Sequence, residues 1–201
     1  MSPQPEGPLP PAHPTPGHPH DEFTSQERGI LLALAREAIL CTLENREISL
    51  QSPSPHLALP RGVFTTIYLR GALRGCVGLV FAVKPLYRNV AETACAAAFE
   101  DTRFPPVSRE EVPDLALGLS ILSPLMPIAA DEIETGRHGL LISMAGHRGL
   151  LLPQVPVEHG WDRIAFLEQA CRKAGLAGDA WKQGARIEAF TAEVFSDQDP
   201  R

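Results

Sequence analysis

The sequence has few cysteines, and they do not stand in metal-binding or redox pairs. No CxxC spacing occurs, which argues against a structural zinc site, and the cysteines are too scattered for a disulfide framework. An iron–sulfur cysteine triplet is also missing, so the chain is not itself a radical-SAM enzyme. We therefore expect free thiols, no metal and no cofactor; the four residues are Cys41, Cys76, Cys95 and Cys171.

Long apolar runs and an excess of positive charge are absent too. No stretch approaches the roughly 20 apolar residues that a membrane span needs. The N-terminal residues are rich in proline and histidine, whereas a signal peptide would be basic and then apolar. The 18 Lys and Arg residues are dispersed and outnumbered by 24 Asp and Glu residues, for a net charge of -6. Because phosphate binding needs clustered cations, we expect no nucleic-acid partner. We expect a soluble, cytoplasmic protein with no membrane partner.

Several common motifs are missing as well. The sequence has no GxxxxGK(S/T) or GxGxxG phosphate loop, no HExxH, no GxSxG and no internal repeat. Its 201 residues, 44% of them hydrophobic, suffice for one domain with a real core, which we place at residues 23–197. Residues 1–22 hold proline at almost every third position and three histidines. We expect them to form a disordered, solvated arm rather than a metal site, and residues 198–201 to form a tail.

The rest of the chain alternates between helical and strand periodicity. A capping box at 24–27 predicts a helix over about 25–43, and alternation from residue 62 predicts two strands in a hairpin around Gly71. Pro85 suits the first turn of a second helix. Farther along, we expect a strand at 115–121 and a short helix at 131–134. Strands 140–144 and 148–152 should follow, joined by a three-residue connection. The last predicted elements are a helix from Asp162 to Gly175 and a strand at about 186–195. Hairpins without βαβ repeats predict an α+β fold with a largely antiparallel sheet and flanking helices.

One strand, the second of the first hairpin, carries an unusual combination of residues. Leu73–Gly78 reads LRGCVG, and glycine inside a strand indicates a bulge or the close approach of another backbone. Strict alternation would place Arg74 and Cys76 on one face. A neighbouring cation favours the thiolate, as a nucleophilic cysteine requires. The alternative is that Cys76 is a small buried hydrophobe.

This stretch and four later blocks resemble one known family. LRGCVG resembles the LRGCIG signature of the AMMECR domain family, called AmmeMemoRadiSam system protein A in prokaryotes, with Val77 in place of isoleucine. The likeness extends over about residues 25–197. The further blocks are similar to the family's in content and order; they are residues 96–106, 136–140, 148–155 and a C-terminal block that starts at residue 173.

The resemblance implies a fold with two unequal lobes and a cleft between them, and it adds candidates for the site. Asp101 or Glu100 would line the cleft as acid or base, although an ion pair between Asp101 and Arg103 that merely holds a loop is the alternative. His138 is a candidate base or cysteine partner, or else a structural histidine. Relatives are encoded beside Memo-like and radical-SAM proteins, which implies a shared pathway or complex.

Three functional hypotheses follow, and the sequence leaves open whether the protein is an enzyme. In the first, it acts on a small-molecule substrate, with Cys76 as reactive group, Arg74 as its electrostatic activator and His138 or Asp101 as proton handler. The substrate contacts would be Gly75, Gly78, Arg103, Arg148 and Gln154. In the second, the protein is a non-enzymatic adaptor for Memo-like and radical-SAM partners. In the third, the LRGCVG motif is structural.

Overall fold

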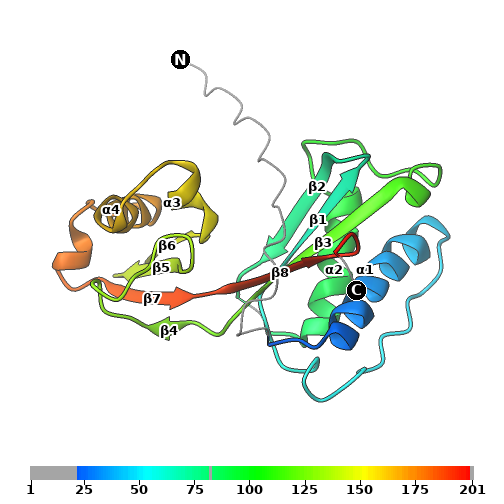
Figure 1. The fold of residues 1–201 in the computed structure, drawn as a ribbon, viewed down its shortest axis with the longest axis horizontal. Coiled ribbons are helices and arrows are strands. Elements are labelled where there is room, and N and C mark those ends of the chain that lie inside the picture. Colours follow the sequence, from blue (N-terminus) through cyan, green and yellow to red (C-terminus); the bar gives the residue numbers. More distant parts are fainter. Residues whose placement is uncertain (1–21, 82, 200–201) are drawn as a thin grey trace. The chain divides into compact units, whose positions relative to one another are not determined.

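The computed structural model describes residues 22–81 and 83–199 and confirms the α+β class (Figure 1). The arm expected at residues 1–22 lies outside this part of the chain, except for Glu22. By their contacts, the described residues form two compact units. The first unit comprises the chain up to Ile121 and from Glu193 onward, and the second comprises Leu122–Ala192. Each unit contains one four-stranded sheet. The cleft between lobes stays a prediction.

The first unit consists of two helices and a sheet in the order β2-β1-β3-β8. The elements are α1 (Ser25–Leu43), β1 (Val63–Leu69), β2 (Ala72–Leu79), α2 (Leu86–Phe99), a 3₁₀ turn at Val112–Asp114, β3 (Leu115–Leu122) and β8 (Ala192–Ser196). The capping box predicted at the start of α1 is present, because Thr24 accepts from the Glu27 N–H and the Glu27 carboxylate accepts from the Thr24 N–H.

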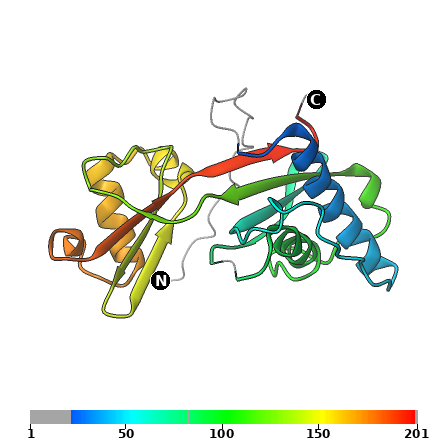
Figure 2. The same cartoon turned by 90° about the horizontal axis from the view of Figure 1, so that it is seen from below.

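The sheet of the first unit has one face against the helices, and these lie on the same side of it (Figures 1 and 2). Residues that alternate along β1 are buried, and they pair with buried residues of β3, as in Ile67 with Leu117. Thr65, on the same face, has its hydroxyl 2.8 Å from that of Thr93 in α2. The predicted hairpin turns at Arg70 and Gly71, both with positive φ, as a two-residue turn of type I′ requires.

Gly75 in β2 marks the close backbone approach that the sequence indicates. A Cβ at this position would lie 2.1 Å from the carbonyl oxygen of Ala97 in α2. Because only a hydrogen fits there, α2 packs directly on the backbone of β2. The glycine therefore sets the distance between this helix and the sheet.

The second unit has a sheet in the order β4-β7-β5-β6 with two helices. Its elements are β4 (Met126–Pro127), β5 (Gly139–Met144), β6 (His147–Leu151), α3 (Gln154–Glu158), α4 (Arg163–Lys173), a 3₁₀ turn at Ala180–Lys182 and β7 (Arg186–Phe190). As predicted, Asp162 caps α4 by accepting from the Ala165 N–H, and Gly175 follows the helix with a φ of +75°. Fully buried Phe166 and Leu167 bring α4 into the core of this unit.

Three local predictions are wrong. The β5–β6 connection has two residues rather than three, because Ala145 and Gly146 both adopt positive φ and His147 already pairs with Met144. Residues 131–134 form no helix: a turn residue and a bend are followed by two residues without regular secondary structure. The strand expected at 186–195 is interrupted at Thr191, so that its two halves, β7 and β8, belong to different sheets.

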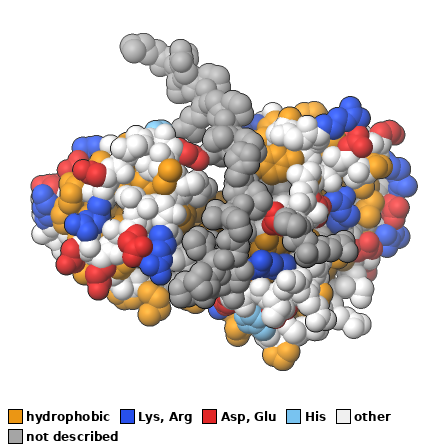
Figure 3. All heavy atoms as spheres, in the orientation of Figure 1, with side chains coloured by type: hydrophobic (Ala, Val, Ile, Leu, Met, Phe, Trp, Pro, Cys, Tyr) orange, Lys and Arg blue, Asp and Glu red, His pale blue; other side chains and the backbone are white. Residues whose placement is uncertain are grey.

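The helices of residues 22–81 and 83–199 include none that is long and apolar enough to cross a membrane. On the face shown in Figure 3, basic and acidic side chains are interspersed over both units rather than separated by sign.

Replacement of Gly75 by alanine tests the contact between α2 and β2. The new methyl group has to push two backbones apart, and we expect Gly75→Ala to lower the free energy of unfolding by about 3 kcal/mol. Gly29→Ala is the matched control, since Gly29 is exposed in α1 with no atom within 4 Å of the added Cβ. It should raise stability by roughly 0.5 to 1 kcal/mol. Urea unfolding of both variants measures this, and equal effects would contradict the close approach.

Candidate functional site around Cys76

Cys76 lies on β2, an edge strand, and its side chain is half-buried. It pairs with Thr66 on β1, and its Sγ lies 3.4 Å from the Thr66 hydroxyl oxygen. Thr66 alternates with the core residues Thr65 and Ile67, so Cys76 and Thr66 lie on the face of the sheet away from the helices. Tyr68 follows on the same face, where burial and the nearby Cys76 raise the pKa of its hydroxyl. The site therefore combines a thiol with two hydroxyl groups.

A β-bulge at Arg74 places the thiol on this face. Leu73 pairs with Tyr68 and Gly75 pairs with Ile67, so Arg74 is an extra residue without a partner on β1. Unbroken pairing from the turn would bring Cys76 opposite Thr65, on the face against the helices. The one-residue shift therefore transfers Cys76 from the core face to the other face.

The side chain of Arg74 is engaged away from the strand. It is 8% exposed, and its guanidinium forms a bidentate pair with Glu111 at 2.9 and 3.0 Å. It also donates to the carbonyl oxygens of Pro105 at 2.7 Å and Pro106 at 3.1 Å. Arg74 in turn holds the pKa of the Glu111 carboxyl below its usual value. These contacts make Arg74 the anchor of the bulge, with its charge compensated by Glu111.

The backbone of Cys76 is bonded to the loop that follows α2. Its N–H donates to Oδ2 of Asp101 at 2.9 Å, and its carbonyl oxygen accepts from Nη2 of Arg103 at 3.3 Å. Arg103 also donates to both oxygens of Asp101, at 2.9 and 2.8 Å. The ion pair between these two residues, predicted as one alternative, is thus present, and it satisfies the edge of β2 where a further strand would otherwise pair.

The Asp101 carboxyl is held in its ionised form. Its side chain is only 7% exposed, and the Arg103 guanidinium, followed by the Cys76 N–H, keeps its pKa far below the usual range. A carboxylate that does not take up a proton near neutral pH is a poor general acid or base. Asp101 thus orients Arg103 and Cys76. The Arg103 side chain is 54% exposed, and the interactions of its guanidinium include Cys76.

Gly78, the other glycine of the motif, makes room for an aromatic ring. It pairs with Phe64, and a Cβ at Gly78 would lie 2.3 Å from ring atoms of that phenylalanine. The ring therefore covers the end of β2 next to Cys76.

The other predicted site residues belong to the second unit. The Nδ1 of His138 accepts from the Glu134 N–H at 3.1 Å, and burial, with a further effect of Arg137, lowers the pKa of this imidazole. Arg148 is exposed on β6 opposite Ser143, and Gln154 is exposed at the start of α3, not at the end of a strand. Cys76, Arg74, Asp101 and Arg103 thus belong to the first unit, whereas His138, Arg148 and Gln154 belong to the second.

Sequence reasoning missed three residues of the Cys76 site: Thr66, Tyr68 and Glu111. The first two follow from the register of the hairpin only once the bulge is known, because simple pairing puts Thr65 opposite Cys76. Glu111 lies 37 residues from Arg74, and no local pattern connects them. Among residues 22–81 and 83–199, no group of three or more His, Cys, Asp and Glu side chains is arranged to hold a metal ion.

The fold and this site define an α+β protein whose edge strand presents a cysteine held by an Asp–Arg pair. Comparison with known proteins identifies the family: the AMMECR1 family model matches residues 32–195. The chain belongs to the AMMECR1 family, as its LRGCVG motif predicts.

The relatives cover nearly the whole chain. A protein of Methanopyrus kandleri is 41% identical over 192 residues, which cover 90% of this chain and 93% of that protein. A protein of Methanococcus aeolicus is 37% identical and covers 90% and 96%, respectively. The crystal structure of an uncharacterized protein from Pyrococcus horikoshii superposes with a TM-score of 0.69 at 39% identity, over 86% of this chain and 92% of that one.

The role of Asp101 as a structural carboxylate predicts a pH-dependent effect of Asp101→Asn. The folded pKa lies below the unfolded one, so the stabilisation is present above the unfolded pKa of about 3.9 and is lost as the pH falls further. We expect Asp101→Asn to cost about 1 to 3 kcal/mol near neutral pH and progressively less in acid. Unfolding curves across pH measure the difference.

Glu134→Gln is the control, since Glu134 also pairs with an arginine, Arg137, but is 59% exposed. It should change stability by less than about 0.5 kcal/mol at any pH. An Asp101→Asn penalty that does not shrink in acid would show that the carboxylate charge is unimportant.

Proposed function

We propose that this AMMECR1-family protein acts on a small molecule through the thiol of Cys76. One observation carries the proposal: a bulge places a half-buried sulfur on the sheet face away from the helices, 3.4 Å from a hydroxyl, in a residue whose carbonyl oxygen accepts from the partly exposed guanidinium of Arg103. A cysteine used only for packing needs none of these neighbours. An arginine close to a partly accessible cysteine is typical of a nucleophilic thiol.

Each neighbour has a separate task in the proposed chemistry. The sulfur of Cys76 adds to the carbon of a substrate carbonyl: the S–C bond forms as the C=O π bond breaks, and the carbonyl oxygen gains the proton that the thiol loses. The Thr66 hydroxyl, 3.4 Å away, orients the sulfur. Arg103 stabilises negative charge on the sulfur or on the substrate, and Asp101 fixes the guanidinium for that purpose. Arg74 acts at a distance by anchoring the bulge.

We infer that the substrate lies across the sheet next to the thiol. Thr66 pairs with Cys76 on one side and with Gly118 of β3 on the other. A Cβ at Gly118 would meet no atom closer than 3.8 Å, so the absence of a side chain there is not required by packing. The lack of a side chain at Gly118, next to Thr66 and Cys76 in the sheet, supports this placement of the substrate.

An adaptor function is the second candidate, favoured by an exposed apolar surface in the first unit. Leu59, Phe81 and Val83 are 44%, 52% and 92% exposed, and the bond from the Leu86 N–H to the Leu59 carbonyl oxygen brings Leu59 to the start of α2. Exposed large apolar side chains in one region suit a protein contact. Memo-like and radical-SAM proteins are the proposed partners.

Alkylation by iodoacetamide tests the reactivity of the thiol. We expect Cys76 to react faster than Cys41 and Cys171, whose burial raises the pKa of both thiols, and faster than Cys95. Arg103→Gln should lower the rate of Cys76 alkylation several-fold, because it removes the nearby positive charge.

Arg137→Gln is the matched control, since Arg137 is an exposed, carboxylate-paired arginine of the second unit, and it should leave the rate unchanged. Mass spectrometry of the labelled cysteines measures all four rates. A Cys76 rate equal to that of glutathione would rule out the nucleophile.

Complementation of a deletion strain separates the enzyme from the adaptor. If Cys76 carries the chemistry, a metabolite that accumulates in the deletion should fall with the wild-type protein but stay high with Cys76→Ser, as measured by metabolite profiling. The adaptor would be favoured if Cys76→Ser rescues the deletion strain while Phe81→Ser neither rescues it nor co-purifies with the partner proteins.

A further inference from the structure

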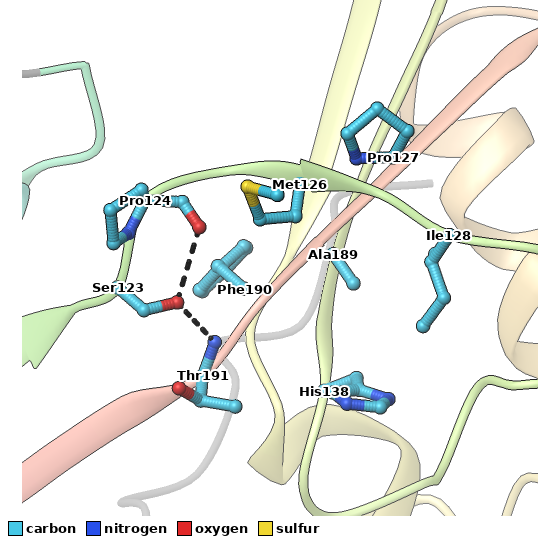
Figure 4. Close-up of a pocket in the computed structure, with 9 residues that line it drawn as sticks. All are labelled: Ser123, Pro124, Met126, Pro127, Ile128, His138, Ala189, Phe190 and Thr191. Carbon is cyan, nitrogen blue, oxygen red and sulfur yellow. Dashed lines mark hydrogen bonds between the residues drawn. The ribbon is translucent and has the colours of Figure 1, made fainter.

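The second unit contains an open pocket that plays no part in the proposal for Cys76. Its volume is about 200 Å³, and it lies where β4 pairs with the end of β7 (Figure 4). Apolar side chains form much of its lining, and one imidazole is the titratable group in it. The residues that matter here are Met126, Pro127, Ile128, Ala189, Phe190 and His138.

Hydrogen bonds and packing fix the walls of the pocket. Ser123 and Thr191 exchange two bonds, from the Ser123 N–H to the Thr191 carbonyl oxygen at 2.9 Å and from the Thr191 N–H to the Ser123 hydroxyl at 3.0 Å. The ring of Phe190 lies on Gly139, where a Cβ would be 2.2 Å from it. The pocket is thus formed before any ligand arrives, as is usual for small-molecule sites.

His138 supplies one uncharged donor to this pocket. Because its Nδ1 accepts from the Glu134 N–H, the neutral ring carries its proton on Nε2. Burial, with a further effect of Arg137, lowers the pKa of the ring, so it is neutral near neutral pH. Arg137 itself is paired with Glu134 at 3.0 Å. Within the described chain, Nε2 has no hydrogen-bond partner.

We propose that this pocket binds a small uncharged molecule with a carbonyl oxygen on a compact apolar group, such as an aromatic amide. The apolar walls contact the ring, and the Nε2–H of His138 donates to the carbonyl oxygen. An apolar cavity of about 150 Å³ holds benzene, so the volume here suits a six-membered ring with a short substituent. A carboxylate fits less well, because no Lys or Arg lines the pocket to replace its hydration.

Three probes of similar size test the chemistry on the full chain: benzamide, benzoate and ethylbenzene. They are titrated near neutral pH while the methyl signals of Met126 and Ile128 are followed by NMR. We expect benzamide to shift these signals and to bind more tightly than benzoate. Tighter binding of benzoate, or no shift of the pocket signals with any probe, would overturn the proposal.

Two variants of His138 isolate the donor. His138→Asn keeps an acceptor for the Glu134 N–H but has no group at the Nε2 position, whereas His138→Gln retains an N–H there. His138→Asn should weaken benzamide about tenfold and leave ethylbenzene unchanged, and His138→Gln should restore most of the loss. Equal benzamide affinity in the wild type and His138→Asn would refute the role of the imidazole. If His138→Asn does not fold, the relative affinities of the three probes for the wild-type protein still test the proposal.

Discussion

The β-bulge at Arg74 is the constraint on which the proposed Cys76 site depends. The side-chain period of a strand is two, so a single extra residue reverses the faces of everything beyond it. Here it turns Cys76 away from α2 and brings Gly75 against the helix instead. A buried guanidinium with one carboxylate and two carbonyl partners holds the extra residue in place. If this anchor were lost, the strand could return to regular pairing, and the thiol would then point into the core.

The loop after α2 gives the site its second support. Asp101 and Arg103 occupy the free edge of β2 by bonding the N–H and the carbonyl of the same residue, Cys76. An exposed strand edge invites pairing with another chain, and here side chains prevent that pairing. The groups that protect the edge also fix the surroundings of the sulfur. Stability and the proposed chemistry therefore rest on the same few contacts, which explains why charged residues with structural partners surround a candidate nucleophile.

The sequence predicted the fold class, the family and most elements, because those depend on local patterns. The capping box at Thr24 marks the start of α1, and Gly75 correctly indicates a close backbone approach. The surroundings of Cys76 were harder to predict. Alternation paired Arg74 with Cys76. The glycines of the motif indicated a bulge as one alternative but not the residue at which it occurs, and the pairing of Arg74 with Glu111 arises from tertiary structure. The break at Thr191 was missed for a similar reason, since the residues on both sides suit a strand.

The course of the chain around Thr191 has a consequence for the architecture. The chain leaves β3 at Leu122 and returns in β8 at Ala192, and these two strands are neighbours in the first sheet. Two hydrogen bonds between Ser123 and Thr191 join the segment that follows β3 to the segment that precedes β8. The second unit is thus an insertion between β3 and β8, two strands that would otherwise form an ordinary hairpin of the first unit. A change in the length of this inserted segment would therefore leave the register of the first sheet unchanged.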